Sequence, residues 1–152
     1  MRNLLTSAFA ILAITLSGCQ STCCDGASPQ DIVDATRAAN AGCKRLTLHC
    51  VQADSSAKVC ASTDSARIGT DSDPEDLRAM QSGEVVVIEE GTAIDVTVPI
   101  LQTDGKWTTV CGVTMERGSM NREQTIQKAK AVAMAVKTGL GDCCPDGSCC
   151  SK

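Results

Sequence analysis

Two stretches of alternating side chains, joined by an Asp-Gly pair, constrain the fold of this 152-residue chain most. The first, residues 92–101, is "TAIDVTVPIL", and the second, residues 106–116, is "KWTTVCGVTME". Alternation is typical of a strand with one buried face, and Asp-Gly is a strong hairpin signal, so the stretches are predicted to pair antiparallel. The side chains expected on the buried face are Ile94, Val96, Val98, Ile100, Thr109, Cys111, Val113 and Met115, whereas Asp95 and Thr97 point to the opposite face.

Shorter segments elsewhere predict further strands, at residues 44–51, 58–62 and 84–90. In the first of these, Leu46, Leu48 and Cys50 share one face, and Thr47, His49 and Val51 share the other. Pro99 lies inside the hairpin and cannot donate a ladder hydrogen bond. It therefore predicts a sheet edge, a bulge or a strand end at that point.

Capping signals predict three helices. The first begins after Ser28 and ends at Gly42, the second lies between Asp73 and Gly83, and the third begins after Asn121. Helical spacing predicts two buried stripes, one of Ile32, Ala35, Ala39 and Cys43, and one of Ile126, Ala129, Ala133, Val136 and Leu140. The order is helix, two strands, short helix, three strands, helix, which favours an α+β fold with one antiparallel sheet.

The first 18 residues have the features of an export signal, because Arg2 precedes an apolar run and small residues precede Cys19. The run Leu16-Ser17-Gly18-Cys19 resembles the lipobox of bacterial lipoproteins. This resemblance implies that Cys19 is lipidated and that the protein is extracytoplasmic, anchored on the periplasmic side of a bacterial membrane or at the cell surface. The alternative is an ordinary secretory signal with a chance cysteine. The expected domains are a leader (1–18), a tether (19–28), one folded domain (29–140) and a Cys-rich tail (141–152).

Composition excludes several classes of function. The net charge is −4 and no basic patch is present, so nucleic acid is not an expected partner. Tyr is absent and the one Phe lies in the leader, which leaves Trp107 as the only aromatic residue of the exported chain. His49 is the only histidine and is expected to be a solvated or satisfied side chain, and no catalytic motif is present. The chain is therefore not expected to be an enzyme.

Residues 29–138 resemble the Cache/PAS-like extracytoplasmic sensor domains. The resemblance lies in "ASTD" (61–64), "RIG" (67–69), "DPEDL" (73–77), "VPI" (98–100) and the segment 105–115. It implies a five-stranded antiparallel sheet in the order 2-1-5-4-3, with helices at both ends of the chain. It also implies a small-molecule binding and sensing module that acts through a signalling partner protein.

In such domains a ligand binds between the sheet and the short helix–loop segment. The resemblance thus implies a site formed by Asp64, Arg67, Asp95, Thr97 and Trp107. Arg67 could bind a small carboxylate and Asp95 an amine. Alternatively, Asp64 and Arg67 only order a surface loop and Asp95 faces water. Three features depart from the family: one aromatic residue, a lipid anchor instead of a receptor, and many cysteines.

The cysteines permit a second function, that of a thiol-rich metal-binding or redox lipoprotein. The tail "CCPDGSCC" contains Cys143, Cys144, Cys149 and Cys150, and the tether contains Cys23 and Cys24. The turn residues at the centre of the tail favour disulfides within it or to the tether, whereas reduced thiolates could bind Zn(II) or Cu(I). A disordered or redox-reactive tail is the third alternative.

Four cysteines, Cys43, Cys50, Cys60 and Cys111, lie in the body of the domain. The implied strand order places Cys50 and Cys111 on neighbouring strands. They are expected to pack as unpaired core thiols or to bond to each other, and two disulfides among the body cysteines are the sharper alternative.

Overall fold

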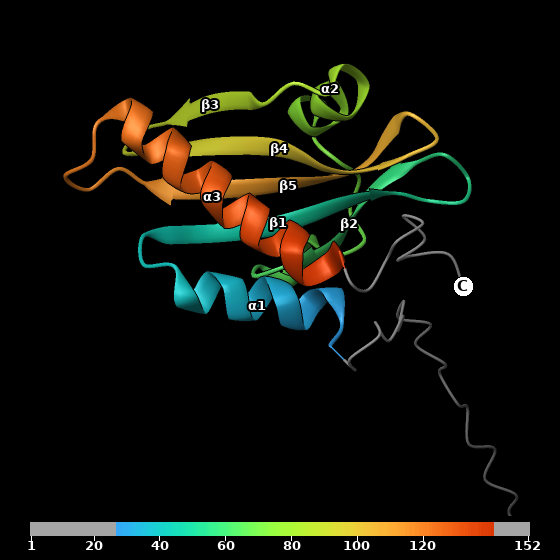
Figure 1. Ribbon diagram of the computed structural model, residues 1–152, viewed down its shortest axis with the longest axis horizontal. Helices are drawn as coiled ribbons and strands as arrows, with labels where there is room; N and C mark the ends of the chain where they lie inside the picture. Colours follow the sequence, from blue (N-terminus) through green and yellow to red (C-terminus); the bar gives the residue numbers. More distant parts are fainter. Residues whose placement is uncertain (1–26, 142–152) are drawn as a thin grey trace, which may run out of the picture.

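The computed structural model describes residues 27–141, so the predicted leader, most of the tether and the tail beyond Gly141 lie outside the described residues. The elements are α1 (Pro29–Ala39), β1 (Cys43–Val51), β2 (Ala57–Ser62), the 3₁₀ turn η1 (Ser65–Arg67), α2 (Pro74–Ser82), β3 (Val86–Glu90), β4 (Ala93–Thr103), β5 (Lys106–Glu116) and α3 (Arg122–Gly141) (Figure 1). The strands form one antiparallel sheet in the order β2-β1-β5-β4-β3. The predicted α+β class and the 2-1-5-4-3 order are confirmed.

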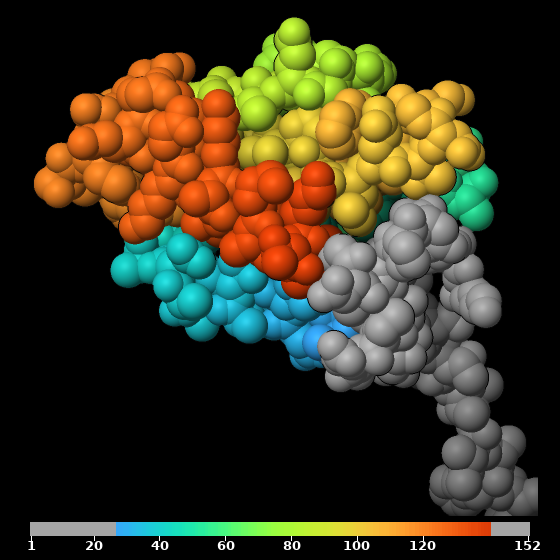
Figure 2. All heavy atoms as spheres, viewed as in Figure 1, coloured from blue at the N-terminus to red at the C-terminus, as the bar shows by residue number. Residues whose placement is uncertain are grey.

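The two faces of the sheet are covered differently. Helices α1 and α3 lie side by side over one face and form a continuous surface in the space-filling view (Figures 1 and 2). The main apolar core lies between them and the sheet, and includes Val33, Leu46, Ile94, Met115 and Val136. The opposite face carries η1 and α2 over a much smaller apolar cluster of Ala79, Met80, Val86 and Val110. Much of that second face is therefore left for polar side chains.

The central hairpin forms as its alternation predicts. Asp104 and Gly105 both adopt positive φ, which is the conformation that a two-residue hairpin turn needs. The predicted inward residues of β4, together with Cys111, Val113 and Met115 of β5, all belong to the main core. Strand β3 pairs with β4 only as far as Thr97, and the β4–β5 register shifts just after Pro99. Pro99 therefore marks a bulge beyond the end of β3, as predicted.

The helices begin where the capping signals predict, but α1 ends at Ala39 and not at Gly42. The stripe predicted for α1 is right at Ile32, which packs against the main core, and wrong at two other positions. Ala35 and Ala39 are exposed, and Val33 is the buried residue of this helix. The helix ends at Ala39, so Cys43 begins β1 instead of extending the stripe. The apolar face is rotated because burying Val33 removes more apolar surface from water than burying two alanines at the helix rim. The stripe predicted for α3 is buried throughout.

Gly83 ends α2 in a left-handed conformation, with φ of 72°, and lies directly against Trp107. A Cβ atom at this position would lie 2.2 Å from Trp107 Nε1. Gly69 also has positive φ, of 85°, but a Cβ there would meet nothing within 4 Å. Both glycines thus have a positive φ, but only Gly83 has other atoms close to the position that a Cβ atom would occupy.

We predict that Gly83→Ala destabilises the domain much more than Gly69→Ala. The Gly69 variant has only the backbone penalty, about 1 kcal/mol. The Gly83 variant adds overpacking against the indole, about 1–3 kcal/mol more. Urea unfolding of both variants measures the difference, and equal losses of stability would show that the indole moves aside at no cost.

Candidate functional site

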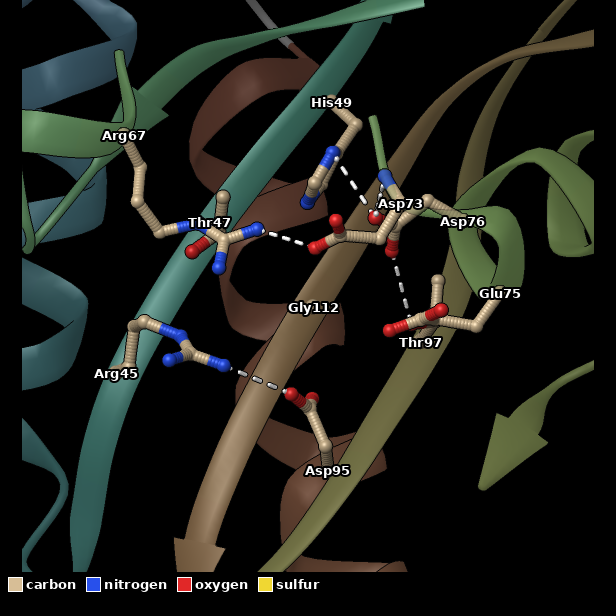
Figure 3. A pocket seen from close by; sticks show the side chains of 10 residues that line it. All are labelled: Arg45, Thr47, His49, Arg67, Asp73, Glu75, Asp76, Asp95, Thr97 and Gly112. Atoms are coloured by element: carbon tan, nitrogen blue, oxygen red, sulfur yellow. Dashed lines mark hydrogen bonds and ion pairs between the residues drawn. The ribbon is translucent and has the colours of Figure 1, made fainter. Parts of the chain in front are cut away.

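Charged and polar side chains gather on the sheet face beneath η1 and α2, and are here called the polar cluster (Figure 3). Its members come from five elements and one connecting residue, Asp73: Arg45, Thr47 and His49 of β1, Arg67 of η1, Glu75 and Asp76 of α2, Asp95 and Thr97 of β4, and Gly112 of β5. Strand alternation explains the gathering, because these positions face away from the main core. The arginines and aspartates point toward one another across a central gap (Figure 3).

A buried histidine–aspartate pair lies at one side of the polar cluster. His49 Nδ1 lies 3.2 Å from Asp76 Oδ2, and the two side chains are only 3% and 5% exposed. Asp76 Oδ1 accepts a hydrogen bond from the Thr97 hydroxyl at 3.1 Å, and Oδ2 accepts one from the Asp73 backbone N–H at 3.1 Å. One carboxylate thus caps α2 and also attaches the helix to β1 and β4.

Burial sets the protonation of this pair. It raises the pKa of Asp76 to about 6, although the hydrogen bonds from Thr97 and Asp73 oppose the increase. Burial, with the nearby Arg67 charge, lowers the pKa of His49 to about 4. At neutral pH His49 is therefore neutral. Its Nδ1 forms a hydrogen bond with the Ser72 hydroxyl at 3.1 Å and also lies 3.2 Å from Asp76 Oδ2, and its other ring nitrogen is Nε2. This nitrogen lies on the side of Gly112, where a Cβ atom would be 3.7 Å from it.

Two arginine–aspartate pairs form the rest of the polar cluster. Arg45 Nη2 donates to Asp95 Oδ2 at 3.1 Å, and the Thr114 hydroxyl donates to the same oxygen at 3.1 Å. Arg67 Nη2 donates to Asp73 Oδ2. Arg67 Nε and Asp95 Oδ1 are buried and have no hydrogen-bond partner. Because buried polar atoms are almost always paired, this donor and this acceptor are each available to a water molecule or a ligand.

The size of the central cavity limits what it can hold in this conformation. Its volume is about 20 Å³, which suits about one water molecule. A groove of about 350 Å³ lies elsewhere on the α2 side, lined by Val51, Leu77, Met80, Lys106 and Trp107, among others. This groove has the volume of a small-molecule site, and Lys106 is the only charged residue among those that line it.

The structure brings together three of the five residues that the sequence proposed for ligand binding, Arg67, Asp95 and Thr97. Asp64 instead caps η1, its carboxylate accepting from the Ala66 backbone N–H at 3.2 Å, which is the loop-ordering alternative. Trp107 lines the separate groove. The sequence prediction did not place His49, Asp76, Asp73 and Arg45 in the site.

Two of the omitted residues of the polar cluster could have been predicted from the sequence. Arg45 and His49 lie on the same strand face as Thr47, and the strand order places that face near Asp95 and Thr97. Asp76 was assigned only to helix capping. Its second role needs the position of α2 over the sheet, which no local pattern specifies.

Of the alternatives for Cys50 and Cys111, a bond between them is wrong, since Cys50 is disulfide-bonded to Cys60, whereas Cys111 is an unpaired core thiol as expected. Cys50 lies opposite Thr109 in the sheet, and Cys111 lies opposite Leu48. A bulge in the β1–β2 register leaves Cys60 as an extra residue beside Cys50. Cys111 and Cys43 are free buried thiols, and burial raises the pKa of each.

The cysteines of the proposed Zn(II) or Cu(I) site lie outside the described residues, as do the lipidation site and the tether cysteines Cys23 and Cys24. Within residues 27–141, no group of three or more Cys, His, Asp or Glu residues could hold a metal ion. The metal and tail-disulfide alternatives therefore stay predictions from the sequence.

Comparison with known proteins supports the fold. No protein-family model matches the chain, and no curated protein matches it. Among solved structures, it is similar to the GAF domain of a phosphoenolpyruvate-protein phosphotransferase from Acinetobacter, with a TM-score of 0.51 and 14% sequence identity. The match covers 74% of this chain and 81% of that domain. The chain thus has a GAF-like, PAS-like α+β fold.

The His49–Asp76 pair predicts opposite pH dependences for two variants. Between pH 4 and 6.5 the unfolded chain protonates His49 and the folded one does not, so this residue makes stability rise with pH. Between pH 3.8 and 6 folded Asp76 holds a proton that the unfolded chain has lost, so this residue makes stability fall as pH rises. The wild type combines both effects.

We therefore expect Asp76→Asn to gain stability from pH 4 to 6.5, and His49→Gln to lose stability from pH 4 to 6. Each slope should differ from that of the wild type by up to about 1.4 kcal/mol per pH unit. Urea unfolding across this range measures the slopes, and every other titrating group is common to the three proteins. Slopes of the same sign in both variants, relative to the wild type, would contradict the assignment.

Proposed function

We propose that this domain is an extracytoplasmic small-molecule binding and sensing module, held on a bacterial membrane by lipid on Cys19. It acts through a partner protein. The GAF-like fold supports a binding role, because domains of this class commonly carry ligands on the sheet face beneath their short helices. The observation that carries the proposal is the buried donor Arg67 Nε and the buried acceptor Asp95 Oδ1, which line one cavity without partners.

The chemistry of the polar cluster favours a small carboxylate, a small amine or a molecule with both groups. A guanidinium binds a carboxylate through two parallel hydrogen bonds, and Arg67 has its Nε–H free for one of them. Asp95 Oδ1 can accept from an ammonium group. Arg45 remains paired with the other Asp95 oxygen.

Binding requires Arg67 to exchange its partner, because the cavity now has room for about one water molecule. Asp73 is the residue to be replaced, and its side chain is 47% exposed, so water can solvate it after release. Asp73 is also the N-cap of α2. Ligand binding would therefore change the contact between η1 and α2, which is the change that a partner protein could detect.

We predict that small carboxylates or amines stabilise the wild type and that Arg67→Gln removes the effect of carboxylates. Acetate, methylammonium and glycine are suitable probes. At ten times the dissociation constant the stabilisation is about 1.4 kcal/mol, or a Tm increase of about 4 °C. Trp107 is the only Trp and Tyr is absent, so its emission reports on the end of α2 that it contacts.

Arg78→Gln is the matched control, because Arg78 lies on α2 with an exposed side chain outside the polar cluster. It should respond to the probes like the wild type. The binding proposal fails if a wide panel of small carboxylates and amines changes neither Tm nor Trp107 emission. An equal response in the Arg67 and Arg78 variants would remove Arg67 from the site.

The anchor is tested separately from the binding site. Among residues 27–141, no helix is both long and apolar enough to cross a membrane. Full-length protein in a bacterial host should be found in the membrane fraction, with acyl chains on Cys19. Cys19→Ser should move it to the soluble extracytoplasmic fraction, whereas Cys23→Ser should not. A Cys19→Ser protein that stays with the membrane would contradict lipid anchoring at this residue.

A further inference from the structure

The groove of about 350 Å³ on the α2 side is a second concave site, separate from the polar cluster. Its walls come from the end of β1, the β1–β2 turn, α2, and the β4–β5 turn with the start of β5. None of the residues that line it lines the polar cluster. Its volume lies within the range of small-molecule sites, about 300–1,000 Å³.

The groove exposes apolar surface that the fold leaves uncovered. Val51 and Leu77 line it and are 37% and 39% exposed, which makes them two of the five large apolar side chains at the surface of residues 27–141. Met80 and Ala57 also line it, and both are part of the smaller apolar cluster or pack against it. An apolar molecule in the groove would therefore extend this cluster and remove its exposed edge from water.

Trp107 forms a wall of the groove, although it is the only aromatic residue of residues 27–141. The main core contains only aliphatic and sulfur-containing side chains. Tryptophan is enriched where a protein surface contacts another molecule, because the indole offers a large apolar face and a polar N–H group. Gly83 lies directly against the indole, since a Cβ atom there would be 2.2 Å from Nε1. The indole is therefore held in place as a wall instead of filling the core.

One charge completes the groove. Lys106 is the only charged residue that lines it, and its side chain is exposed. Among residues 27–141, no carboxylate forms an ion pair with Lys106. Apolar walls beside one cation are complementary to a molecule with an apolar body and one negative group. We propose that the groove binds a small amphipathic carboxylate, with the apolar body against Trp107 and the acid group near Lys106.

This site is independent of the ligand proposed for the polar cluster, but the two sites share a helix. Glu75 and Asp76 of α2 face the polar cluster. Leu77 and Met80 of the same helix line the groove. A molecule in the groove would therefore pack against the helix that Asp76 attaches to the sheet, and would stabilise its position there.

Octanoate is a suitable probe, and octan-1-ol and octylammonium have the same apolar chain with a neutral or positive head group. The chain is produced without residues 1–18 and with Cys19→Ser, so that neither lipid nor detergent competes with the probe and the described domain is intact. Isothermal titration calorimetry measures affinity, and Trp107 emission is recorded alongside it. Octanoate should bind at one site, shift the emission to shorter wavelength, and bind roughly fivefold more tightly than octylammonium.

Two variants separate the contributions of charge and apolar contact. Lys106→Gln should weaken octanoate binding roughly threefold to fivefold and leave octan-1-ol binding unchanged, because an exposed ion pair contributes little. Leu77→Gln should weaken the binding of all three probes about tenfold, because it removes an apolar wall. Met134→Gln is the matched control for Leu77→Gln. Met134 is a 46% exposed apolar residue on α3, which covers the opposite face of the sheet.

Arg67→Gln should leave the octanoate affinity and the Trp107 response unchanged, so failure of one site is distinguishable from failure of the other. The proposal is overturned if folded wild-type protein gives neither heat nor an emission change with octanoate. It is also overturned if Leu77→Gln and Met134→Gln bind octanoate equally well, if octylammonium binds as tightly as octanoate, or if Arg67→Gln abolishes binding. A dimer that Leu77→Gln dissociates, measured by sedimentation, would instead show that a second copy covers the groove. Circular dichroism confirms that each variant is folded.

Discussion

The buried carboxylate of Asp76 is the contact on which the second face of the sheet depends. Transferring a carboxylate from water to a protein interior costs several kcal/mol unless its oxygens are hydrogen-bonded. Asp76 offsets this cost with the Thr97 hydroxyl, the Asp73 backbone N–H and His49. The three partners belong to β4, to the start of α2 and to β1. One side chain therefore determines where α2 lies over the sheet and how the polar cluster is enclosed.

The two faces of the sheet therefore differ in composition, one being apolar and the other largely polar. The face beneath α1 and α3 has a continuous apolar core, which supplies most of the burial that a domain of this size needs. The face beneath α2 has a small apolar cluster beside two arginine–aspartate ion pairs, Arg45–Asp95 and Arg67–Asp73, and the contact of neutral His49 with Asp76. Buried ion pairs add little net stability compared with apolar packing. These pairs and the two unpartnered polar atoms are the observations on which the proposed binding role rests.

The segment from β2 to η1 connects the Cys50–Cys60 disulfide to the Arg67–Asp73 contact. At one end, Cys60 bonds β2 to β1 through the disulfide. At its middle, the Gln30 side chain of α1 donates to the Ser62 carbonyl and accepts from its backbone N–H. At the other end, Arg67 contacts Asp73. A change in the disulfide or in a ligand of Arg67 would therefore act on the same short stretch of chain.

Local sequence patterns determined most of the secondary structure. Alternation in residues 92–101 and 106–116, with Asp104-Gly105 between them, specified the central hairpin and its buried face, because both signals depend only on neighbouring residues. The capping residues Ser28, Asp73 and Asn121 specified the starts of three helices for the same reason. The strand order came from a resemblance to a family, and the fold confirms it.

Contacts between residues that are far apart in the sequence were determined only by the tertiary structure. The bulge between Leu48 and His49 selected Cys60 as the partner of Cys50, and a shift of this kind has no local signature. The placement of α2 brought the buried Asp76 carboxylate against His49, although its sequence position indicated only a cap. The sequence alone thus determined the elements, the faces of the strands and three members of the site. The register, the disulfide and the pairing of buried charges required the packed domain, because they depend on side chains brought together by the whole sheet.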